Sequence, residues 1–128
     1  MRALALLIAA AALIGCEGNT SHTYTFHNRT GDTLFLHLND VNYHSFDSVT
    51  LLLPFSEVKM ANFDDLGGND TPHGLSYIEN AYLVRVNGDT TNAEVLNPTK
   101  WEIYSNQLSK APSSWEHFYH RAFYAEEL

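Results

Sequence analysis

Apolar and polar residues alternate with a period of two along much of the chain after residue 22, which is the spacing of one face of a β-strand. The first two such stretches carry their apolar residues at Tyr24, Phe26, Leu34, Leu36 and Leu38. A three-residue connection with Gly31 in the left-handed region would pair Asn28 with Asp32 and keep both apolar faces on one side. A four-residue connection would break this parity, so the pattern predicts a hairpin.

Further strands are predicted along the middle of the chain. They are residues 46–53, a short strand at Val58 and Met60, residues 82–86, residues 89–93 and residues 101–104. Pro54 ends the first of them, and Asn87-Gly88 is the best short hairpin signal in the chain. Between them, residues 64–76 are rich in Gly, Asp and Asn and predict a long loop.

The C-terminal segment, residues 114–125, fits two structures. As a helix it would gather Trp115, Phe118, Tyr119, Ala122 and Phe123 on one face. As a strand it would place His117, Tyr119, Arg121 and Phe123 on one face, and Phe118, His120, Ala122 and Tyr124 on the other. We favour a strand, because the other strands need partners and an aromatic-rich segment suits a sheet. Seven or eight short strands predict an all-β fold, an antiparallel β-sandwich, immunoglobulin-like or related, over residues 22–128.

The N-terminal segment has a different pattern. After Met1-Arg2, residues 3–13 are an unbroken apolar stretch of Ala, Leu and Ile. A helix needs about 20 residues to cross about 30 Å of hydrocarbon, so this stretch is too short to span a membrane. It is typical of a signal peptide, which we place at residues 1–15.

Leu13-Ile14-Gly15-Cys16 resembles the lipobox of bacterial lipoproteins. The resemblance implies lipid on the Cys16 sulfur, cleavage before Cys16 and a membrane anchor. Cys16 is the only cysteine in the chain, which agrees with an anchor and leaves none for a disulfide. The alternative is an ordinary secretory signal followed by an unrelated cysteine. Residues 16–21 then form a short tether, and Glu17 favours the outer membrane, on its periplasmic face or at the cell surface.

The composition limits the partners of the mature domain. After removal of Arg2 with the signal peptide, six basic residues face 15 acidic ones, a formal charge of −9. Such a surface repels nucleic acid and anionic lipid headgroups. The hydrophobic content of 45% and the aromatic content of 12% indicate a folded domain.

The mature chain is similar to small, mostly uncharacterised lipoproteins of Bacteroidota. The similarity rests on residues 28–34, on the Trp-led strand at 101–104 and on the aromatic end at 117–128. It implies a sandwich-like fold and surface display, and it carries no catalytic residue across. The periplasmic O-glycosylation signal of these bacteria resembles three triplets here, which makes Thr33, Ser48 and Thr90 candidate sites.

Seven histidines raise the question of a metal site. Zinc needs three or four converging ligands. His27 and His37 share the outward face of the predicted hairpin, but the sequence places no third ligand. Asp64, Asp65 and Asp70 could offer oxygens to calcium, although their spacing matches no EF-hand. We expect instead exposed histidines on sheet surfaces, a flexible polar loop and no cofactor.

No enzymatic motif is found. The chain lacks a Gly-x-Ser-x-Gly elbow, a phosphate-binding glycine loop and a His-Glu-x-x-His helix. The aromatic residues near the C-terminus are expected in the core rather than in a groove for glycan or peptide; they are Trp101, Tyr104, Trp115, Phe118, Tyr119, Phe123 and Tyr124. We therefore expect no enzyme but a lipid-anchored interaction module that binds an envelope protein or polysaccharide. The alternatives are a carrier of a small ligand or of zinc or calcium and, more distantly, an accessory hydrolase.

Overall fold

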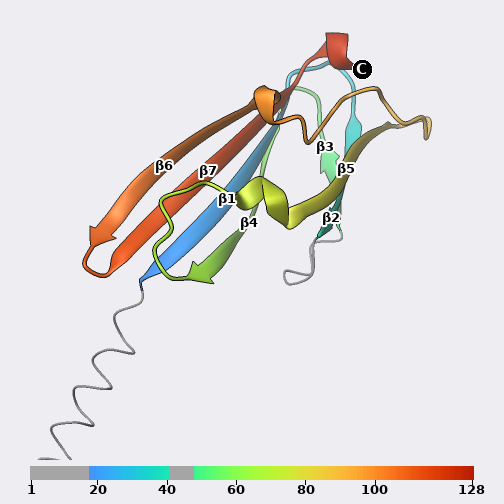
Figure 1. Ribbon diagram of the computed structural model, residues 1–128. Coiled ribbons are helices and arrows are strands. Elements are labelled where there is room, and N and C mark those ends of the chain that lie inside the picture. Colours follow the sequence, from blue (N-terminus) through green and yellow to red (C-terminus); the bar gives the residue numbers. More distant parts are fainter. Residues whose placement is uncertain (1–17, 41–47) are drawn as a thin grey trace, which may run out of the picture.

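The chain folds into two β-sheets, shown in Figure 1 as a computed structural model that describes residues 18–40 and 48–128. The strands are β1 (Asn19–Asn28), β2 (Leu34–Asp40), β3 (Ser48–Leu52), β4 (Glu57–Leu66), β5 (Ile78–Arg85), β6 (Trp101–Lys110) and β7 (Ser113–Phe123). Two short 3₁₀ turns lie between strands, η1 (Gly74–Tyr77) and η2 (Pro98–Lys100), and a third, η3 (Ala125–Glu127), follows the last strand. The described residues contain no α-helix, and the predicted all-β fold is confirmed.

The four-stranded sheet has the order β4-β1-β7-β6, and the three-stranded sheet has the order β3-β2-β5. Neighbouring strands are antiparallel except β1 and β7, which run parallel from the pair Thr20–Trp115 to the pair Asn28–Phe123. The expectation of a wholly antiparallel sandwich is wrong at this pair. Parallel pairing joins the two ends of the domain, so no local turn signal announces it.

The predicted hairpin between the first two strands is also wrong, because β1 and β2 lie in different sheets. The buried Asn28 side chain holds the corner between them. Its Nδ2 donates to the carbonyl oxygens of Asp32 at 2.7 Å and of Leu52 and Leu53 at 3.1 Å. Its Oδ1 accepts from the Thr30 backbone N–H at 3.0 Å. β1 and β2 face each other across the core, so the apolar residues of both strands point inward. A hairpin would have placed the same residues in the core, so the alternation fits both arrangements.

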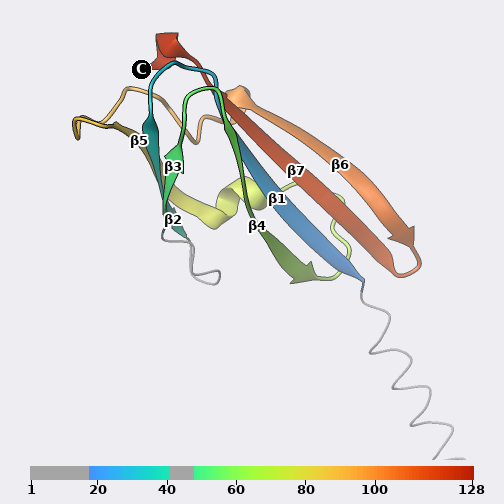
Figure 2. The same ribbon diagram turned by 180° about the vertical axis from the view of Figure 1, so that it is seen from behind.

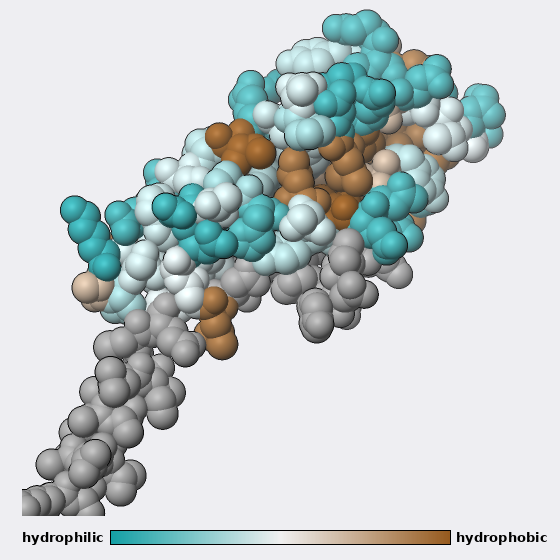
Figure 3. Space-filling view, in the orientation of Figure 1, coloured by the Kyte–Doolittle hydropathy of each residue, from teal (hydrophilic) through white to brown (hydrophobic). Residues whose placement is uncertain are grey.

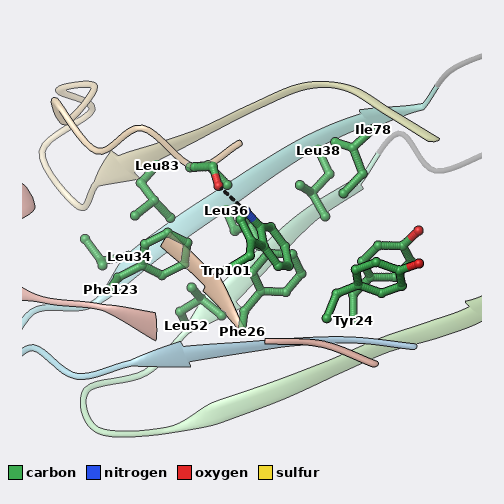
Figure 4. Packing of buried hydrophobic residues seen from close by; sticks show 12 residues of the cluster. Tyr24, Phe26, Leu34, Leu36, Leu38, Leu52, Ile78, Leu83, Trp101 and Phe123 are labelled. Atoms are coloured by element: carbon green, nitrogen blue, oxygen red, sulfur yellow. Dashed lines mark hydrogen bonds between the residues drawn. The ribbon is translucent and has the colours of Figure 1, made fainter. Parts of the chain in front are cut away.

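One apolar core fills the space between the sheets (Figure 4). Its largest apolar side chains come from both sheets, and those that are fully buried are Tyr24, Phe26, Leu34, Leu36, Leu52, Leu83, Tyr119 and Phe123. Trp101 closes one side, and its indole N–H donates to the carbonyl oxygen of Val95 at 2.8 Å, the dashed line in Figure 4. Each such side chain contributes about 1.5–3 kcal/mol through its burial. Figure 3 shows that apolar side chains also reach the surface between the sheets, with polar residues around them.

The C-terminal segment is a strand, as favoured from the sequence. In β7 the side chains of His117, Tyr119, Arg121 and Phe123 are buried and alternate with less buried neighbours. This is the face assignment that the period of two predicted.

Other element bounds differ from those predicted. Residues 89–93 make only a single bridge, between Thr90 and Val84, rather than a strand. β1 already begins at Asn19, so residues 19–21 belong to the sheet and not to the tether. The predicted strand at 46–53 is present as β3, and its first two residues lie outside the described part of the chain. β4 extends to Leu66, which shortens the predicted loop at its start.

Beyond the apolar core, the inner face of the four-stranded sheet is polar and is covered by residues 67–77 (Figure 1). The Tyr119 hydroxyl accepts from the Gly74 N–H and contacts His22 Nδ1, both at 2.8 Å. His117 Nε2 donates to the Asn69 carbonyl oxygen at 2.7 Å. His22 and His117 are therefore fully buried, which corrects the expectation that the histidines lie exposed on sheet surfaces.

Candidate functional site

The outer face of the three-stranded sheet carries two rows of mainly apolar side chains. We call it the apolar face, and its residues are Phe35, Val49, Leu51, Tyr82 and Val84. Phe35 on the central strand lies between Leu51 and Val84 in register, and His37 lies between Val49 and Tyr82 in the next row. The inner face takes the alternate residues of the same strands, such as the buried Leu36 and Leu83.

The apolar face is open to solvent at its β3 side. The side chains of Val49 and Leu51 are 60% and 48% exposed, and Leu53 and Phe55 continue the exposed apolar surface past the end of the strand. His37 is the one polar group in the two rows, and its ring stacks on Tyr82 with 4.6 Å between ring centroids. A contiguous exposed apolar surface is uncommon on a single folded domain, which makes this one a candidate interaction site.

The outer face of the four-stranded sheet is polar instead, and Figure 2 shows it without any described element in front of it. A row of hydrogen-bonding side chains crosses its four strands. Glu57 Oε2 lies 3.1 Å from His27 Nδ1, and His27 Nε2 lies 3.4 Å from His120 Nδ1. His120 Nε2 then lies 3.0 Å from the Tyr104 hydroxyl. The row joins β4, β1, β7 and β6 in that order.

Aromatic packing and burial fix this row in place. The Tyr104 ring stacks on Phe118 with 5.0 Å between centroids, and the rings of His27 and His120 stack at 5.6 Å. Thr25, on the same face, is nearly fully buried. Burial, followed by the neighbouring positive charge of His27, lowers the pKa of His120 below its ordinary 6.5. His120 is therefore a neutral imidazole at pH 7.

A cleft of about 460 Å³ adjoins the row at the end of the sheet where β1 and β7 finish. Its walls mix charges of both signs, from Arg29, Lys100, Arg121, Glu102, Glu126 and Glu127, with His27, His120, Ala122 and Tyr124. Such a lining offers both hydrogen-bond donors and acceptors, and it places the two histidines at an accessible wall.

Arg121 and Glu127 stabilise the floor of this cleft. The Arg121 side chain is buried, and its Nη2 lies 2.7 Å from Glu127 Oε1 and donates to the Glu94 carbonyl oxygen at 3.1 Å. Burial opposes the charged form of Glu127, but hydrogen bonds from Arg121, from the Tyr124 N–H and from Lys100 outweigh it and lower the pKa of Glu127 to about 2. This ion pair holds the C-terminal turn η3 against β7.

The histidine pair expected from the sequence is not formed. His27 and His37 lie in different sheets, because β1 and β2 are not a hairpin. The structure brings His27 to His120 instead, and sequence reasoning missed this pair. It follows from the parallel register of β1 and β7, in which Thr25 is opposite His120.

The acidic candidates for calcium do not share a loop. Asp64 and Asp65 belong to β4, with side chains outside the described part of the structure, whereas Asp70 lies in the loop that follows. Within residues 18–40 and 48–128, no group of three or more His, Cys, Asp or Glu side chains is placed to hold a metal ion.

The residues of the anchor lie outside the described part of the chain; they are Leu13, Ile14, Gly15 and Cys16. Of the candidate glycosylation sites, Thr90 is exposed and Thr33 is half-buried, while the side chain of Ser48 is not described. Lipidation and glycosylation both stay predictions. Among the described residues, no helix is long and apolar enough to span a membrane.

The aromatic residues near the C-terminus divide between core and surface. Trp101, Tyr119 and Phe123 are buried, as expected for the core. Tyr104 and Tyr124 are 50% and 49% exposed; Tyr104 lies on the outer face of the four-stranded sheet, and Tyr124 lines the cleft just past the end of β7.

Neither family profiles, nor curated protein sequences, nor solved structures give a match to this chain.

Proposed function

We propose that this chain is a lipid-anchored protein of the bacterial cell envelope whose domain binds another protein through the apolar face. The observation that carries the proposal is the exposed apolar surface on β2, β3 and β5, in which Val49 and Leu51 are the most exposed apolar side chains of the strands. Folding of this chain alone gives no reason for it, because the same strands already bury their inner residues in the core.

The anchor is supported by the lipobox ending at Cys16 and by the apolar stretch before it. Two or three acyl chains would hold the protein permanently, at about 0.8 kcal/mol per buried CH₂ group. Because β1 begins at Asn19, only Glu17 and Gly18 would separate the lipid from the sheet. The start of β1 would then face the bilayer.

This anchoring would direct the apolar face away from the membrane. β1 extends over ten residues, about 30 Å, from the proposed membrane end. Figure 1 shows the three-stranded sheet and the C-terminus toward the other end of the long sheet. A partner could therefore reach the apolar face from the periplasm or from the medium.

The chemistry of the partner follows from the charge of the domain. A mature chain with a formal charge of −9 repels a second copy of itself and attracts a basic protein. We therefore propose a partner with an apolar patch surrounded by Lys and Arg residues. A self-associating dimer is the alternative outcome of the test below.

The fold itself is proposed to be a relative of the immunoglobulin sandwich and not a member with the same strand order. In immunoglobulin domains the first two strands lie in one sheet. Here β1 and β2 lie in opposite sheets, and β1 pairs with the last strand.

Site-specific photo-crosslinking in native cells tests the proposal. A photoreactive residue in place of Leu51 should give one crosslinked product, whereas the same residue in place of Asn106, on the polar outer face, should not. The partner in that product should be basic and should rebind the purified protein. A product with the mass of two copies, or equal crosslinking from both positions, would reject the proposed partner.

The anchor is tested separately by cell fractionation. The Cys16→Ser variant should leave the membrane fraction while keeping the circular dichroism spectrum of the β-domain. If the variant stays in the membrane fraction, lipid on Cys16 is not the anchor.

A further inference from the structure

The pair His27 and His120 is built like a metal-binding pair. Both residues lie on the two central strands of the four-stranded sheet, and the parallel register sets their rings beside each other. The facing atoms are His27 Nε2 and His120 Nδ1, 3.4 Å apart. The His27 side chain is only 15% exposed, so its ring is held in position before any ligand arrives.

The outer nitrogens of the two rings have partners that can hold the ring protons, so both facing nitrogens can turn a lone pair toward an ion. A carboxylate only accepts hydrogen bonds, so the His27 nitrogen beside Glu57, Nδ1, carries a proton, and Nε2 is the nitrogen left for a metal ion. The Tyr104 hydroxyl, which can both donate and accept, lies 3.0 Å from His120 Nε2, and it accepts from Nε2–H in the tautomer whose Nδ1 carries the lone pair. This is the arrangement in which metal-binding histidines donate their second N–H to a carboxylate or another acceptor.

The separation of the two facing nitrogens fits one tetrahedral ion. Zinc–nitrogen bonds of about 2.0–2.1 Å at a tetrahedral angle place two ligand atoms about 3.3–3.4 Å apart. A hydrogen bond between the rings would instead bring the nitrogens to about 3.0 Å. The observed 3.4 Å is therefore long for a hydrogen bond and suited to a shared ion.

We propose that His27 Nε2 and His120 Nδ1 together bind one divalent transition-metal ion, with Zn²⁺ as the representative. The described residues supply no third His, Cys, Asp or Glu ligand, so water from the adjoining cleft completes the coordination. The remaining positions stay exchangeable, and an outside donor can occupy them. This site depends neither on the lipid anchor nor on the apolar face.

Calorimetric titration of the detergent-solubilised full chain with ZnCl₂, without a histidine tag, tests the site. The wild type should bind one zinc ion per chain, and His27→Ala and His120→Ala should each weaken binding at least tenfold. His37→Ala is the matched control, since it removes a partly exposed histidine from the other sheet and should leave the affinity unchanged. Glu57→Gln should weaken binding about tenfold through the lost carboxylate.

A second measurement identifies the atoms. Side-chain ¹⁵N NMR should show zinc on Nε2 of His27 and on Nδ1 of His120, and circular dichroism should show each variant folded. If an alanine variant does not fold, the corresponding glutamine variant replaces it. The proposal is overturned if millimolar zinc does not bind, or if the two variants bind zinc as the wild type does. It is also overturned if His37→Ala loses as much affinity as they do.

Discussion

The two sheets have similar inner faces but very different outer faces. Each buries an apolar inner face in the shared core. The outer face of the four-stranded sheet carries threonines and a row of Glu57, two histidines and Tyr104 in polar contact, as a sheet facing water should. The outer face of the three-stranded sheet carries Phe35, Leu51 and Val84 in one row. The difference is the basis for the proposal that the apolar face binds a partner.

The largest predicted effect is a difference in the free energy of unfolding between substitutions on the inner and outer faces of the three-stranded sheet. Leu36 is fully buried, and Leu36→Ala should lower the free energy of unfolding by about 3 kcal/mol through lost packing and a new cavity. Leu51→Ala, on the outer side of the neighbouring strand, should change it by less than about 1 kcal/mol. Urea unfolding monitored by circular dichroism measures both. Equal losses would mean that Leu51 is part of the core.

A smaller effect on stability, and on its pH dependence, should distinguish the charged end of the four-stranded sheet from the apolar face. The pKa of Glu127 is lowered from 4.5 to about 2, and its side chain is 10% exposed. Its carboxylate therefore stabilises the folded state above pH 4.5, and this contribution is lost as the pH falls toward 2. Glu127→Gln should cost about 2 kcal/mol at pH 7 and flatten the acid loss of stability.

The control for that measurement is Leu51→Ala, which should keep the pH dependence of the wild type. Unfolding curves between pH 7 and pH 3 give both profiles. A Glu127→Gln variant that loses stability in acid as steeply as the wild type would assign the acid sensitivity to other carboxylates.

The smallest effect concerns the hydrogen-bonded row on the polar face. Tyr104→Phe removes the hydroxyl beside His120 but keeps the stacking on Phe118. Because Tyr104 is half exposed, water replaces the lost bond, and the stability should fall by less than about 1 kcal/mol. Thermal unfolding measures the change. A loss above about 2 kcal/mol would show that the row is a structural support of the sheet.

Alternation along the chain predicted which residues face the core, but not which strands are neighbours. Phe26 and Leu34 point into one core whether their strands lie side by side or face each other, so parity alone cannot choose. The Asn28-x-Thr30 sequence is the local feature that marks where the chain leaves the first sheet. Asn28 Oδ1 accepts the Thr30 N–H, a local turn that leads the chain out of the sheet.

The candidate sites depend on contacts that are distant in sequence. The His27–His120 pair joins residues 93 positions apart, through a parallel strand pair without a local turn. The apolar face follows from the packing of β2 between β3 and β5, which no local pattern encodes. Val49 and Leu51 face outward because Leu52, on the alternate face of the same strand, is buried in the core.

The central claim, that the apolar face binds a protein partner, is tested most directly by one paired substitution in the full chain. Leu51→Lys puts a charge on the apolar face, and Asn106→Lys puts the same charge on the polar outer face. Native complexes extracted from membranes are then sized by sedimentation velocity. The proposal predicts that Leu51→Lys reduces the amount of complex at least tenfold, while Asn106→Lys retains it. Complexes of unchanged size and amount in the Leu51→Lys variant would contradict it.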